Sequence, residues 1–198
     1  ISLVVVAIIV AFPFLWTFLT MLKTPQEAMQ LPPTLLPRHI TLENLRTICT
    51  TAGFPRFFGN TILVVAAATI MSVLTSALAG YIFAKFRFVG KTILFWAILA
   101  TTMIPFEAYM VPLYLLMRKV NLVDTYLAVM APLFITGFGI FFMRQTFLTV
   151  PDDYIHAARV DGCPEWRIFA QVCLPMVRAP VSALAIYMFL FNWKFFIW

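Results

Sequence analysis

Residues 57–84 read FFGNTILVVAAATIMSVLTSALAGYIFA, which is the longest run of the chain without Asp, Glu, Lys or Arg. Because about 20 apolar helical residues cross the hydrocarbon core of a bilayer, this run predicts a membrane-spanning helix. Ser72, Ser76 and Gly80 recur in it at every fourth position, so three small side chains share one helical face. We expect this face to pack closely against a second helix. The alternative is a chance spacing in a helix rich in alanine.

The composition of the whole chain also indicates a membrane protein. Hydrophobic residues make up 63% of the chain and charged residues 11%, whereas a soluble domain carries about 25% charged residues. The net charge of +6 is spread over the loops between apolar runs, which suits lipid headgroups rather than nucleic acid. The cysteines and histidines lack the spacing of metal ligands or of a disulfide framework. We therefore expect a lipid bilayer as a partner, no nucleic acid and no metal site.

Five apolar runs along the chain predict an all-α integral membrane protein, a polytopic helical bundle. The expected spans lie at about residues 2–22, 57–84, 92–117, 125–148 and 179–198. Because the first and last runs start and stop abruptly, we expect both termini to be truncated and a sixth span to follow. The chain as given, residues 1–198, is then a single transmembrane domain.

Two longer polar stretches connect these spans, a proline-rich loop at 23–56 and an amphiphilic loop at 149–178. Positive charges are densest between Lys85 and Lys91, and the cytoplasmic loops of membrane proteins are enriched in Lys and Arg. With five spans, the loop at 149–178 lies on the same side of the membrane as this basic cluster. We therefore expect residues 149–178 in the cytoplasm and residues 23–56 outside it.

Three polar side chains in the predicted spans are candidates to line a solute path: Glu107, Asn192 and Lys194. A carboxylate in apolar surroundings is costly and by default a functional candidate. Pro105 and Pro112 free backbone groups on either side of Glu107, as happens where a helix breaks near a cavity. The alternatives are that Glu107 lies near a membrane interface at a bent helix end, and that Lys194 extends to the interface.

The loop at 149–178 contains a short helix with clear start and stop signals. Asp152 and Asp153 supply negative charge and side-chain acceptors where the first N–H groups of a helix are unpaired. Gly162 suits the left-handed residue that ends a helix. Pro164 starts a second helix, which we expect to end at Pro175. The apolar stripe of this second helix consists of Trp166, Phe169, Val172 and Cys173.

A helix of about ten residues is marginal alone in water, so the helix that begins at Asp152 needs a surface to pack on. Tyr154, Ala157, Ala158 and Asp161 fall at i, i+3, i+4 and i+7 and share one face that is flat at its centre. A flat alanine patch suits the close docking of another protein. The alternative is a linker helix that lies on its own membrane domain.

A longer motif surrounds this helix. His156-Ala157-Ala158 is followed by Asp161-Gly162, then by Val172-Cys173-Leu174-Pro175 and by Pro180. The pattern resembles the EAA loop of bacterial ABC importer permeases of the sugar, or maltose-type, branch. His156 stands where the family has Glu, and Cys163 where it has Ala. The resemblance extends over the chain through Asn60-Thr61, the basic cluster at 86–91 and the aromatic residues from Trp193 to Trp198.

The resemblance implies a multi-pass permease subunit in the bacterial inner membrane, which serves an ATP-driven importer for a sugar or a related solute. It implies that a coupling helix docks on an ATPase subunit through Asp152, Asp153, Tyr154, His156, Ala157, Ala158, Arg159, Asp161 and Gly162. The implied partners are a second permease subunit, two ATPase subunits and an extracytoplasmic solute-binding protein. ATP and Mg²⁺ would be held by the ATPase subunits, and this chain would carry no cofactor and no catalytic residue.

Two other classes of membrane protein are alternatives. An ion- or proton-driven secondary carrier would also need polar residues such as Glu107 and Lys194, but such carriers often show internal repeats, and the helix at Asp152 would stay unexplained. A membrane-embedded enzyme would need a nucleophile and a base, or metal ligands, within the spans. The two distant histidines and the absence of an acidic cluster in the sequence argue against an enzyme.

Overall fold

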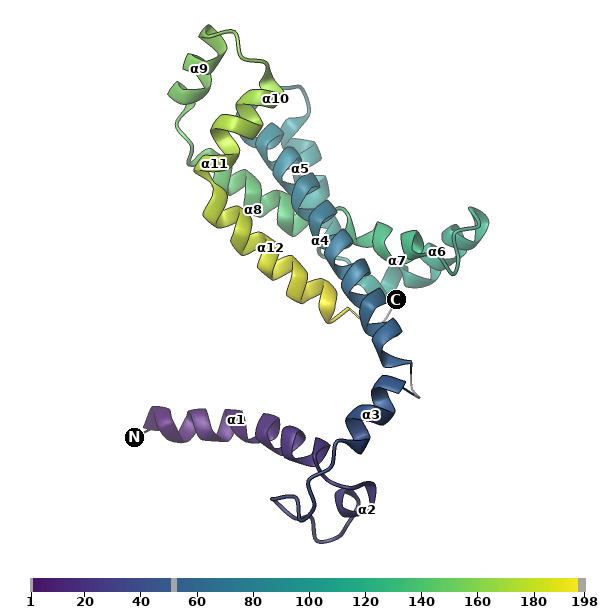
Figure 1. Ribbon diagram of the computed structural model, residues 1–198. Coiled ribbons are helices and arrows are strands. Elements are labelled where there is room, and N and C mark those ends of the chain that lie inside the picture. Colours follow the sequence, from purple (N-terminus) through teal and green to yellow (C-terminus); the bar gives the residue numbers. More distant parts are fainter. Residues whose placement is uncertain (1, 51–52, 196–198) are drawn as a thin grey trace. The chain divides into compact units, whose positions relative to one another are not determined.

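The computed structural model describes residues 2–50 and 53–195, with side chains from residue 4 onward. Within these ranges every regular element is a helix (Figure 1), which confirms the predicted all-α fold class. In chain order the elements are α1 (Ser2–Met21), α2 (Pro25–Ala28), α3 (Glu43–Thr50), α4 (Phe54–Lys85), α5 (Lys91–Thr101), α6 (Phe106–Lys119), α7 (Tyr126–Met130), η1 (Ala131–Leu133), α8 (Gly137–Leu148), α9 (Asp152–Val160), α10 (Glu165–Arg167), η2 (Ile168–Cys173), α11 (Leu174–Met176) and α12 (Arg178–Trp193).

The chain divides into two compact units, Ile1–Asn60 and Thr61–Trp198. The first unit contains α1, α2, α3 and the first residues of α4, and the second contains the rest of α4 and all later helices. The motif around α9 and all predicted site residues therefore belong to the second unit.

The number of helices that could cross a membrane agrees with the five predicted spans. Val4–Met21 of α1 and the whole of α4 are long and apolar enough on their own. Three further helix pairs meet the same criterion when each bent pair is counted as one passage, which gives up to five spans in the described part of the chain. The share of Val4–Met21 that is buried within the chain is 0%, as suits a helix whose side chains face lipid. Which loops face the cytoplasm stays a prediction.

The loop after α1 is folded around two buried ionisable side chains. Glu27 Oε1 accepts hydrogen bonds from Thr34 Oγ1 at 3.0 Å and from the Arg38 N–H at 2.9 Å. The Lys23 ammonium donates to the Thr34 carbonyl and lies 4.8 Å from the centre of the Trp16 ring. Because buried charges need such partners, these contacts define the structure of the first unit.

The third predicted span, at 92–117, is not one straight passage. α5 and α6 form an angle of 97° across a short break. Pro105 occupies the N-cap of α6; proline has no N–H to donate and disfavours a helical residue before it, so α5 ends at Thr101. The fourth predicted span, at 125–148, bends by 45° between η1 and α8.

The helix before the last predicted span differs from the sequence-based expectation. It does not end at Pro175, which lies in the first turn of α11, where the missing N–H of proline is tolerated. Residues Ile168–Cys173 are π-helical, and this i→i+5 pattern displaces the apolar stripe expected of an α-helix. Trp166, in α10 just before this segment, is 64% exposed rather than packed. α12 then forms the last predicted span, of which residues 196–198 lie outside the described residues.

The core of the second unit lies between α4, α8 and α12, with α9 and η2 across one end (Figure 1). Met143 and Phe147 of α8 are fully buried there, and Leu184 of α12 is 1% exposed. The buried Asn192 side chain donates to Thr69 Oγ1 at 3.2 Å and so links α12 to α4. This framework positions α9 because the inner side of α9 belongs to the same hydrophobic cluster.

The three small residues of α4 are all buried, as a packing role requires. A Cβ added to Gly80 would lie 2.6 Å from Met143 Cβ of α8, and Ser76 lies against Gly139 of the same helix. Ser72 donates its hydroxyl to the Thr69 carbonyl at 3.0 Å within α4. The geometry favours close packing of α4 on α8 over a chance spacing.

Candidate functional site

α9 lies in the connection between α8 and α12, at one end of the second unit (Figure 1). Pro151 is its N-cap, and no side chain caps the first turn, so the predicted capping by Asp152 and Asp153 is wrong. Both carboxylates still lie in the first turn, where the helix dipole favours negative charge. The predicted left-handed stop is confirmed, because Gly162 has a φ of 76°.

α9 has one face on the bundle and one open face. Ile155 and Ala158 are buried, at 2% and 9% exposure, within the main hydrophobic cluster. Tyr154, Ala157 and Asp161 are exposed. The prediction that Ala158 belongs to the open face is therefore wrong. Ile155 and Ala158 are three residues apart, so they lie on the same side of α9, and that side faces the core. The buried side of α9 fits the alternative of a linker helix that lies on its own domain, and docking on the exposed side stays a prediction.

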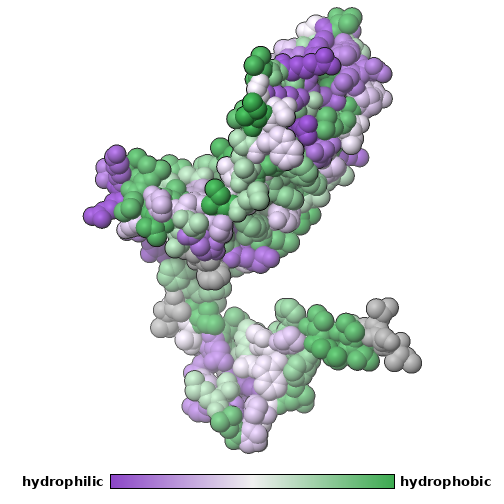
Figure 2. Space-filling model, turned by 180° about the vertical axis from the view of Figure 1, so that it is seen from behind, coloured by the Kyte–Doolittle hydropathy of each residue, from purple (hydrophilic) through white to green (hydrophobic). Residues whose placement is uncertain are grey.

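The other residues predicted to dock on a partner are exposed: Asp152, Asp153, Tyr154, His156, Ala157, Arg159, Asp161 and Gly162. Two large apolar side chains that were not among them add to the open surface, because Val160 is 87% exposed and Trp166 64%. Figure 2 shows hydrophilic residues gathered at the end of the second unit that carries α9, and hydrophobic residues over its middle. Tyr154, Val160 and Trp166 are thus exposed apolar side chains on a largely polar surface.

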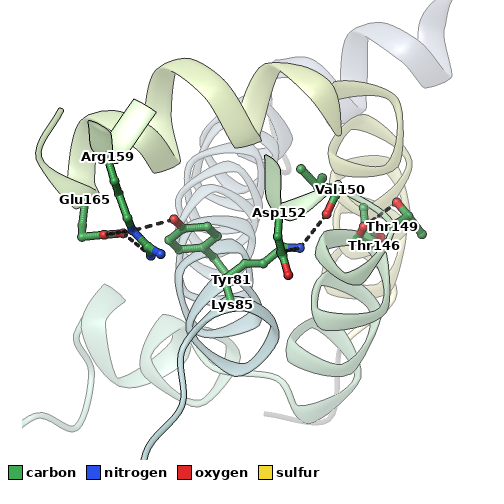
Figure 3. Close-up of polar contacts among 8 residues, drawn as sticks. All are labelled: Tyr81, Lys85, Thr146, Thr149, Val150, Asp152, Arg159 and Glu165. Carbon is green, nitrogen blue, oxygen red and sulfur yellow. Dashed lines mark hydrogen bonds and ion pairs between the residues drawn. The ribbon is translucent and has the colours of Figure 1, made fainter. Parts of the chain in front are cut away.

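Lys85, the last residue of α4, holds the start of α9 (Figure 3). Its Nζ donates to Asp152 Oδ1 and to the Val150 carbonyl, both at 2.6 Å. The Lys85 side chain is only 6% exposed and the Asp152 side chain 64%, so two acceptors offset the cost of burying the ammonium. The hydrogen bond from Lys85, together with its charge, lowers the pKa of Asp152.

A second polar contact lies at the other end of α9 (Figure 3). Arg159 donates to both carboxylate oxygens of Glu165, from Nε to Oε1 at 2.6 Å and from Nη2 to Oε2 at 3.2 Å. Tyr81 Oη of α4 donates to Glu165 Oε2 at 3.4 Å. The hydrogen bond from Arg159 lowers the pKa of Glu165. Arg159 and Glu165 thereby close the turn between α9 and α10.

Tyr81 also packs α4 against the segments on either side of α9. Its ring centre lies 5.5 Å from that of Phe147 in α8 and 5.2 Å from that of Phe169 in η2. The sequence reasoning missed Tyr81 and Lys85 as site residues. No local pattern signals them, because their partners lie 84 and 67 residues further along the chain.

Among the described residues, no hydrogen bond or ion pair joins the three predicted path residues to one another. Glu107 is exposed in the first turn of α6, and Lys194 is exposed at the C-cap of α12. Asn192 is 5% exposed and bonded to Thr69. A cavity of about 350 Å³ lies beside the bends of α5–α6 and η1–α8, and its described lining residues include none of the three. Their role in solute passage stays a prediction.

The α9 site combines two ion pairs with a largely polar surface that exposes a few apolar side chains. Across residues 2–50 and 53–195, no three His, Cys, Asp or Glu side chains gather where they could hold a metal ion. Cys49, Cys163 and Cys173 are free thiols.

Comparison with known proteins finds relatives among bacterial transport proteins. The arabinooligosaccharides transport system permease protein of Halalkalibacterium halodurans is 37% identical over 196 residues, which are 98% of this chain and 70% of the relative. The lactose transport system permease protein of Rhizobium radiobacter is 32% identical, over 94% of this chain and 68% of the relative. A solved bacterial ABC transporter involved in the import of the acidic polysaccharide alginate matches the fold with a TM-score of 0.89 at 22% identity, over 100% of this chain and 70% of that chain.

A protein family matches the part of the chain that carries the site. The family described as binding-protein-dependent transport system inner membrane component matches residues 76–198, a range that includes Lys85, α9 and α12. This match confirms the resemblance to importer permeases and the multi-pass inner-membrane location, and it argues against the ion- or proton-driven carrier. The chain belongs to the binding-protein-dependent transport system inner membrane components and is a permease subunit of an ABC importer.

Proposed function

We propose that this chain forms one half of the membrane pathway of a sugar importer and receives its driving force through α9. Two relatives are named for the transport of arabinooligosaccharides and of lactose, which supports a sugar as the solute. The partners in this proposal are a second permease subunit, two ATPase subunits and an extracytoplasmic solute-binding protein. ATP and Mg²⁺ would be bound by the ATPase subunits.

The observation that carries the proposal is the division of α9 into two faces. Ile155 and Ala158 fix α9 to its own bundle, whereas Tyr154, Ala157 and Val160 are exposed on the other side. A short helix with one face packed on the bundle and one face exposed can transmit a displacement. A partner that binds the exposed face and moves would move the packed face with it. Docking of an ATPase subunit on Tyr154, Ala157 and Val160 would use this property.

In the proposed mechanism, ATP binding closes the ATPase dimer and displaces the docked α9. The bundle of α4, α8 and α12 then shifts between an outward-facing and an inward-facing arrangement, which is a rigid-body transition between two states. This chain changes no covalent bond in the cycle. Its contribution is the coupling of a remote reaction to the gate.

Cysteine cross-linking to the ATPase subunit tests the docking face. In a variant of the full-length protein without Cys49, Cys163 and Cys173, we expect Ala157→Cys to cross-link to the co-expressed ATPase subunit. Ala158→Cys is the matched control, because the adjacent Ala158 is 9% exposed and faces the core. A functional complex in which Ala157→Cys gives no cross-link, or in which both positions react equally, would contradict the proposal.

The cavity beside the helix bends is the part of this chain that suits a sugar. Broken membrane helices commonly form solute sites, and this cavity adjoins the breaks at residues 102–105 and 134–136. Its described lining residues are all uncharged and include Tyr109, Tyr187 and Phe191. An anionic group here would need Lys or Arg beside it, so we propose that the part of the solute that contacts this half of the pathway is uncharged.

Uptake measurements test the cavity. We expect Tyr187→Ala to raise the half-saturation concentration for a neutral oligosaccharide about tenfold, which corresponds to the loss of about 1.4 kcal/mol of binding. Ile186→Ala is the control, because Ile186 is 64% exposed next to it in α12 and does not line the cavity. Unchanged uptake by Tyr187→Ala, or an equal loss in Ile186→Ala, would contradict this assignment.

A further inference from the structure

α4 contacts α9 through side chains, whereas α8 and α12 are connected to α9 by short stretches of backbone. α8 continues into α9 over residues 149–151, and α12 follows α9 through α10, η2 and α11. A displacement of α9 therefore acts on α8 and α12 along covalent connections. α4 ends 67 residues before Asp152, so any movement that reaches α4 must pass through non-covalent contacts.

Two residues of α4, Tyr81 and Lys85, make polar contacts with α9 or with the turn that follows it. Tyr81 and Lys85 are one helical turn apart and therefore lie on the same side of α4. Lys85 contacts the start of α9 at Val150 and Asp152, and Tyr81 contacts Glu165, the partner of Arg159 in the last turn of α9 (Figure 3). The two contacts thus lie at opposite ends of α9.

The Lys85 contact is the firmer of the two. Both of its hydrogen bonds are 2.6 Å long, whereas the Tyr81 bond is 3.4 Å, near the limit for a hydrogen bond. The Lys85 side chain is 6% exposed, so salt and water screen its charge less than they screen a surface charge. The Val150 carbonyl fixes the backbone of the connector, and the Asp152 carboxylate fixes the first turn of α9.

We infer that Lys85 is a positioning residue of the transport cycle, which ties the start of α9 to α4 so that a displacement of α9 is passed to α4. The inference rests on the proposed docking of an ATPase subunit on α9. Without this tie, the start of α9 is linked to α4 only through apolar packing and the longer Tyr81 contact, so less of its displacement reaches the end of α4. The gate then opens incompletely although the ATPase subunits still complete their cycle.

The ratio of ATP hydrolysed to solute imported tests the tie. In the full-length protein, assembled with its partner subunits in liposomes, we expect Lys85→Met to lower uptake about tenfold, a typical size for coupling between sites, while ATP hydrolysis continues. Lys85→Arg should restore most uptake, because a guanidinium also donates to a carbonyl and a carboxylate at once. Lys91→Met is the matched control, because Lys91 Nζ donates to the Phe86 carbonyl within its own loop.

Every other result overturns the inference. A Lys85→Met complex with the wild-type ratio of ATP to solute shows that Lys85 is not needed for coupling. Failure of that variant to assemble, with normal Lys85→Gln and Lys85→Arg complexes, shows a role in folding alone. The proposed docking is checked separately by the Ala157→Cys cross-link and by ATP-dependent uptake of the wild type, so its failure is distinguished from failure of the tie.

Discussion

Gly80 leaves no room for a side chain because α4 and α8 touch at this position. A Cβ on Gly80 would lie 2.6 Å from Met143 Cβ and 2.8 Å from the backbone N of Arg144. Since a backbone cannot move aside unless the helices part, we expect Gly80→Ala to lower the free energy of unfolding by about 1–3 kcal/mol, the usual cost of overpacking. Thermal unfolding in detergent measures the loss. Gly59→Ala is the control, because a Cβ there has nothing within 4 Å, and equal stability of the two variants would contradict the prediction.

The Arg159–Glu165 pair makes stability depend on pH. The hydrogen bond from Arg159 lowers the pKa of Glu165 in the folded protein, so the carboxylate stabilises the fold above its ordinary pKa and ceases to do so as the pH falls through the lowered value. The side chains are 37% and 42% exposed, which limits the pair to about 1 kcal/mol or less. We expect Glu165→Gln to be less stable than wild type at pH 7, and the difference to disappear at an acidic pH below the lowered pKa of Glu165. Unfolding measured at both pH values checks this; a difference that does not change with pH would refute it.

At the scale of residues, sequence reasoning succeeds where the requirement is local. Gly162 is predictable because a left-handed residue at a helix end favours glycine, and the stripe containing Gly80 follows from helical periodicity. The Lys85–Asp152 contact joins residues 67 positions apart, and no local sequence pattern at either residue predicts it. The expected capping role of Asp152 fails because Pro151 is the N-cap, so that Asp152 is already the first residue of α9.

At the scale of elements, α9 depends on one buried side chain for its position. Ile155 is 2% exposed in the main hydrophobic cluster, so we expect Ile155→Ala to cost about 2–5 kcal/mol of the free energy that holds α9 on the bundle. Hydrogen exchange of the amides in Asp152–Val160 measures this local opening. Val160→Ala should leave the exchange unchanged, because Val160 is 87% exposed. Equal protection in Ile155→Ala and wild type would show that α9 is held by other contacts.

The elements that the sequence predicts well are those with a strong local cause. The long uncharged run at 57–84 becomes the single helix α4, and the break near Pro105 follows from the missing N–H of proline. The angle of 97° at that break is not predictable, because packing sets the direction in which α6 leaves. The π-helical segment Ile168–Cys173 is not predictable from a pattern with a period of 3.6 residues.

At the scale of the whole molecule, the class of protein follows from composition and motif, whereas the working parts follow from the structure. The pattern around His156-Ala157-Ala158 resembles that of the family. The two alanines and the turn at Gly162 are present, although His156 stands where the family has Glu. The same pattern does not separate the inner from the outer face of α9. That separation depends on the core formed by α4, α8 and α12, which lies far from the motif in sequence.

The two compact units should respond separately to substitution, because different contacts hold each of them. The loop after α1 depends on Glu27, whose hydrogen bond from the Arg38 N–H lowers its pKa. Glu27→Ala removes this acceptor and the negative charge beside Lys23, so we expect faster limited proteolysis within residues 23–50. Hydrogen exchange in α9 should stay as in wild type.

Glu43→Ala is the control for this last substitution, because Glu43 is an exposed carboxylate in the first turn of α3. Its removal should change neither the proteolysis of the loop nor the protection of α9. Since substitutions at sites without shared partners have additive effects, the double variant Glu27→Ala, Ile155→Ala should show the sum of the two single effects. Loss of protection in α9 caused by Glu27→Ala alone would instead mean that the two units unfold as one.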